Sequence, residues 1–70
     1  MTYKELVKKL RLLGCKEIPR RGRGSHRKWQ NPLTGRTVVI PDWGSKDLKK
    51  GTIRAIVKQL GIKWGEFLKV

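Results

Sequence analysis

The first residues of the chain alternate between apolar and basic positions with the period of an α-helix. Thr2 and Glu5 fit a capping box, in which each side chain accepts a hydrogen bond from a backbone N–H at the helix start. Gly14 is a natural stop, because glycine readily adopts the left-handed conformation that ends many helices. The pattern therefore predicts an amphipathic helix from Thr2 to Leu13. Its apolar positions are Tyr3, Leu6, Val7, Leu10 and Leu13, and its basic positions are Lys4, Lys8, Lys9 and Arg11.

The middle of the chain changes to the two-residue period of β-strands. We expect short strands over residues 15–20, 25–30 and 36–40, the last rich in β-branched residues and closed by Pro41. The residues at 31–35 have the composition of a turn. Short connections between adjacent strands are typical of an antiparallel meander. Within the second strand, alternation places Arg27 and Trp29 on one face and His26, Lys28 and Gln30 on the other.

A second helical pattern occupies the last third of the chain. Thr52 precedes a run of apolar residues at helical spacing, and Gly61 ends this run. Trp64, Phe67 and Leu68 fit one more helical turn that returns to the core. We therefore expect a second amphipathic helix followed by a short helical tail.

The order of these elements predicts the fold class. We expect a single α+β domain over residues 1–70, with the order α-β-β-β-α. Its three-stranded antiparallel sheet is covered on one face by two helices, as in double-stranded-RNA-binding domains (dsRBD-like), although a layout alone does not establish a function. A chain this short buries a small share of its surface, so we expect function on an open face or in a groove completed by a partner.

Charge points to the class of partner. The 18 basic residues against 5 acidic ones give a formal net charge of +13, which attracts polyanions. Nucleic acid is the leading partner class. An anionic membrane surface ranks well below it, because the positive charge is spread over predicted loops and strands as well as helices.

Cysteine usage and hydropathy exclude other classes of site and of protein. Cys15 is the only cysteine, so an intrachain disulfide and a Cys-rich zinc site are excluded, and we expect a small buried residue there. No apolar run approaches transmembrane length, and the N-terminus has charges where a signal peptide needs its apolar core. We expect a cytoplasmic protein.

The stretch at 20–29 concentrates positive charge directly before the only histidine of the chain. RNA carries its own nucleophile, because a deprotonated 2′-OH attacks the adjacent phosphate. An imidazole is the side chain best suited to accept that proton near neutral pH. His26 is therefore the candidate catalytic base, in a reaction that requires no metal and no cofactor. The candidate RNA-binding residues are Arg20, Arg21, Arg23, Gly24, Ser25, Arg27 and Lys28.

Each of these assignments has a plainer interpretation. The arginines also fit a solvated hairpin loop, and Ser25 fits a cap on a backbone group. For His26 the pattern alone favours an exposed strand residue without catalysis, since lone histidines are common and no acid partner is visible. Trp29 and Trp64 fit apolar core faces. Trp43 lies in a predicted loop, where it fits base stacking, contact with a protein partner, or packing over the sheet edge.

The sequence Gly-Ser-His-Arg-Lys-Trp at 24–29 resembles the HicA family of bacterial and archaeal toxins, whose members carry Gly-Ser-His followed, after two further residues, by an aromatic residue. The run at 48–62, followed by Glu66 and Phe67, is similar to the second helix and tail of that family. With the first helix, the resemblance spans nearly the whole chain. Many family members carry a second histidine two residues past the proline that ends the third strand. That position is Trp43 here, so no role of the second histidine carries over.

The resemblance implies a fold related to the double-stranded-RNA-binding domain and the activity of an mRNA interferase in which His26 is needed for RNA cleavage. It also implies a cognate HicB-type antitoxin. We therefore expect the toxin of a type II toxin–antitoxin system, a metal-independent endoribonuclease whose partners are mRNA and an acidic HicB-type antitoxin. The main alternative is a non-catalytic RNA-binding module of dsRBD-like fold. A DNA-binding domain ranks third, and it predicts indifference to the 2′-OH.

Overall fold

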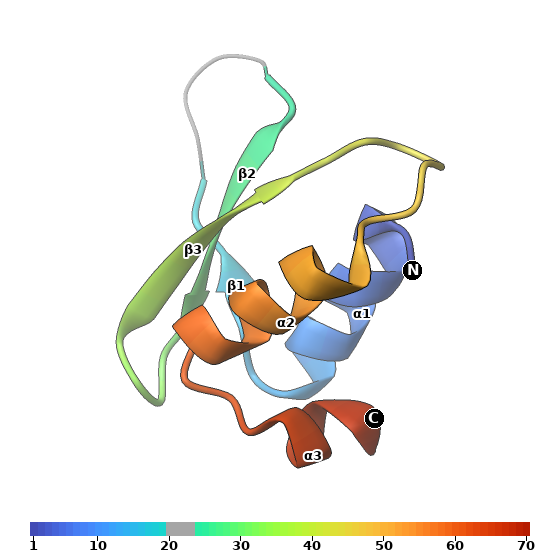
Figure 1. Ribbon diagram of the computed structural model, residues 1–70. Coiled ribbons are helices and arrows are strands. Elements are labelled where there is room, and N and C mark those ends of the chain that lie inside the picture. Colours follow the sequence, from blue (N-terminus) through green and yellow to red (C-terminus); the bar gives the residue numbers. More distant parts are fainter. Residues whose placement is uncertain (20–23) are drawn as a thin grey trace.

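A sheet runs through the molecule with its helices gathered on one side (Figure 1). The computed structural model describes residues 1–19 and 24–70, so the arginines at 20, 21 and 23 lie outside the described residues. None of the helices in the described ranges is long and apolar enough to cross a membrane. The predicted order of elements is confirmed. In chain order they are helix α1 (Tyr3–Leu12), strands β1 (Lys16–Glu17), β2 (His26–Asn31) and β3 (Arg36–Pro41), and helices α2 (Lys50–Gln59) and α3 (Trp64–Leu68).

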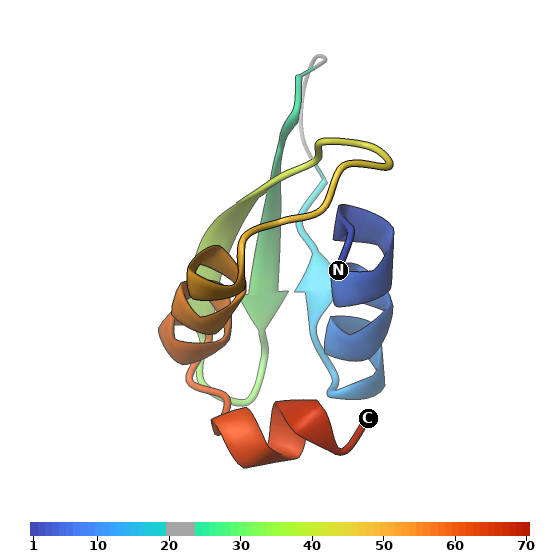
Figure 2. The same ribbon diagram turned by 45° about the vertical axis from the view of Figure 1, so that its right-hand side comes forward.

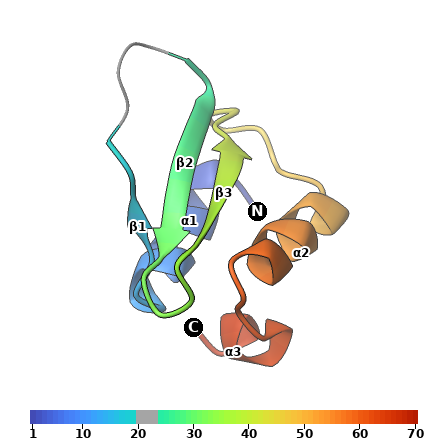
Figure 3. The ribbon, with the colours of Figure 1, turned by 90° about the vertical axis from the view of Figure 1, so that its left-hand side faces the viewer.

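The sheet is the predicted antiparallel meander, with the strand order β1-β2-β3. Strand β2 pairs with β3 along its whole length, from His26 opposite Pro41 to Asn31 opposite Arg36. Strand β1 pairs with the other edge of β2, where Lys16 lies opposite Gln30. Helices α1 and α2 lie on the same side of the sheet (Figure 2), and none of the described helices covers the other face (Figure 3). The predicted α+β arrangement of two layers is therefore confirmed.

Helix α1 begins at the predicted capping box. The N–H of Thr2 donates to Glu5 Oε1 (2.9 Å), and the N–H of Glu5 donates to Thr2 Oγ1 (3.3 Å). The bond from the Thr2 backbone holds the pKa of Glu5 below its ordinary value, because it favours the charged carboxylate. The helix ends at Leu12, and Gly14 follows with a φ of +92°. The predicted capping box and the predicted glycine stop therefore lie at the two ends of this helix.

The core fills the space between the sheet and the helices, with Trp29 fully buried in it. The indole N–H of Trp29 donates to the hydroxyl of Tyr3 (2.9 Å), so a strand and a helix share a buried hydrogen bond. Cys15 is buried as expected. The loop before α2 adds Leu48, which no periodic pattern marked. The buried apolar residues are Tyr3, Leu6, Val7, Leu10, Cys15, Trp29, Val38, Ile40, Leu48, Ile53, Ile56, Val57, Leu60, Ile62 and Phe67.

Three details differ from the prediction. Strand β1 has only 2 residues, and Pro19, which has no N–H, lies beyond its end. Helix α2 begins at Lys50, before Thr52, and has no side-chain cap. Leu68 is 58% exposed and does not return to the core. Successive helical residues point about 100° apart, and the adjacent Phe67 takes the buried position.

Asn31 lies at the end of β2 rather than in the turn to which its composition assigns it. It is 3% exposed, and both ends of its amide are bonded. Its Nδ2 donates to the carbonyl of Leu60 (2.9 Å), and its Oδ1 accepts the N–H of Leu33 (3.1 Å). Asn31 therefore ties the β2–β3 turn to the end of α2.

Candidate nucleic-acid interface

The uncovered face of β2 carries the only histidine of the chain. His26 and Lys28 are exposed on this face, whereas Trp29 is buried toward the helices. The predicted alternation is confirmed. The pairing of β2 with β3 also continues beyond His26 and Pro41, because the N–H of Asp42 donates to the carbonyl of Ser25. His26 therefore lies in a segment that pairs with β3 and its continuation both before and after His26.

The flanking strands add further side chains to this face, which we call the open face. Residues directly opposite in an antiparallel pair share a face, so the strand register assigns them. The N–H of Ile18 donates to the carbonyl of Lys28 (2.8 Å), which continues the register beyond β1. The described residues of the open face include two lysines and no carboxylate, so the face attracts anions. They are Lys16, Ile18, His26, Lys28, Gln30, Thr37, Val39 and Pro41.

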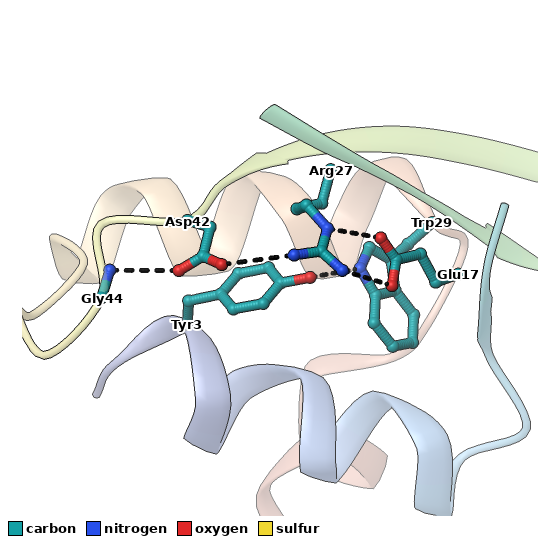
Figure 4. Close-up of polar contacts among 6 residues, drawn as sticks. All are labelled: Tyr3, Glu17, Arg27, Trp29, Asp42 and Gly44. Atoms are coloured by element: carbon teal, nitrogen blue, oxygen red, sulfur yellow. Dashed lines mark hydrogen bonds and ion pairs between the residues drawn. The ribbon is translucent and has the colours of Figure 1, made fainter. Parts of the chain in front are cut away.

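Arg27 lies on the opposite, helix-covered side of β2 (Figure 4). Its Nε donates to Oε2 of Glu17, and its Nη2 donates to Oε1 of the same carboxylate (2.9 Å). Its Nη1 lies 3.5 Å from Oδ2 of Asp42. The hydrogen bonds to Glu17 raise the pKa of Arg27 above its ordinary value. Both acidic partners thus hold this guanidinium away from the open face, and an RNA contact by Arg27 stays a prediction.

Tyr3 supports the same side of β2 from helix α1 (Figure 4). Its hydroxyl accepts the hydrogen bond from Trp29, and its ring centroid lies 5.9 Å from Cζ of Arg27. Burial raises the pKa of Tyr3, because the phenolate loses its hydration. Arg27 and Trp29, the two neighbours of Lys28 in the sequence, therefore both contact Tyr3 of helix α1. These contacts fix the direction in which the open face points.

The other predicted RNA-binding residues precede β2. Gly24 and Ser25 are exposed and lead directly into His26. The carbonyl of Ser25 accepts the N–H of Asp42, which is a contact between backbone atoms. The contact of Ser25 with a phosphate stays a prediction. The structure thus places His26 and Lys28 on one face, with Gly24 and Ser25 directly before His26 in the chain, while Arg27 points to the other side.

The described side chains give little support to metal binding or to a cysteine nucleophile. Within residues 1–19 and 24–70, no three histidine, cysteine, aspartate or glutamate side chains gather in a group that would hold a metal ion. Burial raises the pKa of the Cys15 thiol, which disfavours the reactive thiolate. Cys15 is therefore a core residue and is poorly suited to act as a nucleophile.

Comparison with known proteins shows the family to which this chain belongs. The family described as the HicA toxin of bacterial toxin–antitoxin systems matches residues 3–62. A protein of Pseudomonas fluorescens (strain Pf0-1), named "Probable mRNA interferase HicA", is 40% identical over 63 residues, which are 90% of this chain and 98% of that relative. No solved structure shows a significant match. The chain therefore belongs to the HicA family of bacterial toxins.

Proposed function

We propose that this chain is an endoribonuclease toxin that cleaves mRNA with His26 as its catalytic base. Membership of the HicA family supports the assignment to a toxin–antitoxin system, and the name of the Pseudomonas relative supports the mRNA substrate. The observation that carries the proposal is the open face itself. It presents His26 beside Lys28, and its described residues include no carboxylate that would repel RNA.

The proposed reaction uses the nucleophile that RNA provides. The imidazole of His26 accepts the proton of a 2′-OH, and the 2′-oxygen then attacks the adjacent phosphorus. The bond from phosphorus to the 5′-oxygen breaks, and the 5′-oxygen takes a proton from solvent, which reaches this exposed face. The products are a 2′,3′-cyclic phosphate and a 5′-hydroxyl. The step needs neither a metal nor a cofactor, and a general base of this kind contributes about 10²- to 10⁴-fold.

Charge on the open face assists this step. The ammonium of Lys28 lies on the same face as His26, where it stabilises the negative charge that develops on the phosphate oxygens. Lys16 extends the positive surface across the sheet toward β1. Gly24 and Ser25, together with the arginines at 20, 21 and 23, are the proposed contacts of the RNA backbone on the approach to His26.

The same surface is the proposed target of the antitoxin. A HicB-type antitoxin with an acidic surface would cover His26 and Lys28, which blocks the base and neutralises the charge that holds RNA. We place the pair in the cytoplasm, where mRNA is translated. An antitoxin complex that leaves His26 open and still binds RNA contradicts inhibition by occlusion.

Cleavage of a labelled RNA in EDTA tests the proposal. The protein should cut the unmodified RNA, leave a 2′-O-methyl copy intact, and release fragments that end in a cyclic phosphate. A requirement for added metal, or cleavage of the 2′-O-methyl copy, contradicts the proposed chemistry. Binding of both RNAs without cleavage of either would favour a non-catalytic RNA-binding module.

A further inference from the structure

The loop between β3 and α2 carries an exposed tryptophan near the end of the sheet where His26 lies. Trp43 follows Pro41 by two positions, and Pro41 is the residue opposite His26. Successive Cα atoms are about 3.8 Å apart, so the Cα of Trp43 lies within about 8 Å of the Cα of Pro41. The residue between them, Asp42, donates its N–H to Ser25. Trp43 is therefore a close neighbour of the segment that leads into His26.

The hydrophobic core does not account for Trp43. Trp29 is fully buried, and Trp64 is half-buried with its ring stacked on Phe67 at a centroid distance of 5.3 Å. Trp43 is 43% exposed. A large, partly exposed aromatic ring near the end of the sheet where His26 lies is the kind of side chain on which an unpaired base stacks.

The backbone on both sides of Trp43 is held in place. The N–H of Gly44 donates to Oδ1 of Asp42 (3.1 Å), and the other oxygen of that carboxylate pairs with Arg27 (Figure 4). The carbonyl of Trp43 accepts the N–H of Lys46 (3.2 Å). A ring on such an anchored turn loses little conformational freedom when a ligand binds.

A cation accompanies the ring. The Nζ of Lys46 lies 5.6 Å from the centroid of the Trp43 ring. The ammonium group lies over one face of the ring. The base of a nucleotide would stack on the opposite face, and the phosphate of the strand would meet the cation.

We propose that Trp43 is the binding site for one unpaired nucleobase of the RNA strand, with Lys46 contacting a phosphate of the same strand. This inference rests on the proposed RNA substrate, and it does not depend on catalysis by His26. Stacking of one base on an aromatic side chain corresponds to a loss of about 5- to 150-fold in affinity when the ring is removed. Because every base has a π-face, Trp43 positions the strand without strong preference among bases.

Binding by the full chain in a His26→Ala background tests this inference, because the RNA is then not consumed. The probes are a short labelled oligouridine and an abasic chain of the same length, measured by fluorescence anisotropy. Trp43→Ala should weaken binding of the oligouridine about 5- to 150-fold and leave binding of the abasic chain nearly unchanged. Leu33→Ala is the matched control, since Leu33 is an exposed apolar residue (88%) in the turn at the far end of β2 and β3, and it should change neither affinity.

Tryptophan emission provides a second measurement. The oligouridine should quench the emission of the His26→Ala protein, and Trp43→Phe should remove most of that quenching because the two remaining tryptophans are buried or half-buried. Equal losses of affinity for both probes, or no loss for either, overturn the inference. An unchanged RNA affinity combined with weaker antitoxin binding also overturns it and assigns Trp43 to a protein partner.

The two proposals fail in different ways. Absence of cleavage by the wild type with RNA binding retained removes the nuclease and leaves the stacking site standing. Absence of RNA binding by the His26→Ala protein removes the stacking site.

Discussion

The guanidinium of Arg27 forms two hydrogen bonds with the carboxylate of Glu17, Nε to Oε2 and Nη2 to Oε1. Glu17 belongs to β1, and the second acidic partner of this arginine, Asp42, directly follows β3. Arg27 therefore joins the segments on both sides of β2, one residue away from His26. A cation in the most basic stretch of the chain thus holds the strands together on the side opposite the open face.

The pair of Arg27 and Glu17 should stabilise the fold. We expect Arg27→Ala and Glu17→Ala each to lower the midpoint of thermal unfolding. The double variant should lose less than the sum, because both substitutions remove the same interaction. Circular dichroism melting of the four proteins measures this coupling. Arg36→Ala is the control, since Arg36 is exposed and has no ion pair with a described carboxylate. Strictly additive losses would show that the two residues act independently.

The buried bond between Tyr3 and Trp29 predicts a loss of stability in Tyr3→Phe. The substitution leaves the indole N–H without its acceptor in the core, which costs about 1–3 kcal/mol in the free energy of unfolding. Urea unfolding at pH 7 measures this cost. A variant as stable as the wild type would mean that the indole N–H finds another partner.

The same residue predicts a dependence on alkaline pH. Burial raises the pKa of Tyr3 above that of an unfolded tyrosine, about 10. Above that pH the unfolded chain releases a proton that the folded protein retains, so the free energy of unfolding falls as pH rises. Tyr3→Phe lacks this contribution. Urea unfolding from pH 7 to alkaline pH should therefore show the advantage of the wild type over Tyr3→Phe shrinking above about pH 10. A constant difference at every pH would contradict it.

Substitution of two glycines with positive φ distinguishes the stability cost of backbone strain from that of a steric clash. Gly14 has a φ of +92° with no atom within 4 Å of an added Cβ, whereas at Gly61, with a φ of +73°, that Cβ would lie 2.8 Å from Cγ2 of Thr34. Gly14→Ala should cost about 1–2 kcal/mol from the left-handed conformation alone. Gly61→Ala should cost more, as measured by urea unfolding. Equal costs would mean that the Thr34 side chain moves aside without penalty.

Lys28 on the open face should contact a phosphate. Lys28→Gln in the His26→Ala background should weaken RNA binding and reduce the slope of log K against log salt concentration by about 0.7, the contribution of one single-strand phosphate. Lys58→Gln removes an exposed lysine from α2, on the helix-covered side, and should leave the slope unchanged. Anisotropy titrations at several salt concentrations compare them. Equal effects of the two substitutions would place the RNA elsewhere.

Local patterns predicted most of the fold. The two amphipathic helices, the capping box and the alternation that separates His26 from Trp29 depend on residues a few positions apart, so the sequence shows them directly. The family resemblance, rather than any pattern, singled out His26 as catalytic. The structure adds the surroundings of His26, which depend on how distant segments come together.

Contacts between distant segments were harder to predict. The partners of Arg27 depend on the strand register, and burial of Asn31 depends on how the β2–β3 turn meets the end of α2. One signal was available for Arg27. The alternation that turns Lys28 toward the open face puts Arg27 on the side of Trp29, and the chain has only 5 acidic residues with which to hold it.

The rate at which His26→Ala cleaves RNA under single-turnover conditions tests the central claim most directly. Wild type and variant should share the same circular dichroism spectrum and bind a 2′-O-methyl RNA with similar affinity, because His26 is exposed on the sheet. The variant should nevertheless cleave unmodified RNA about 10²- to 10⁴-fold more slowly. A folded His26→Ala protein that cleaves at the wild-type rate would contradict the assignment of His26 as the catalytic base.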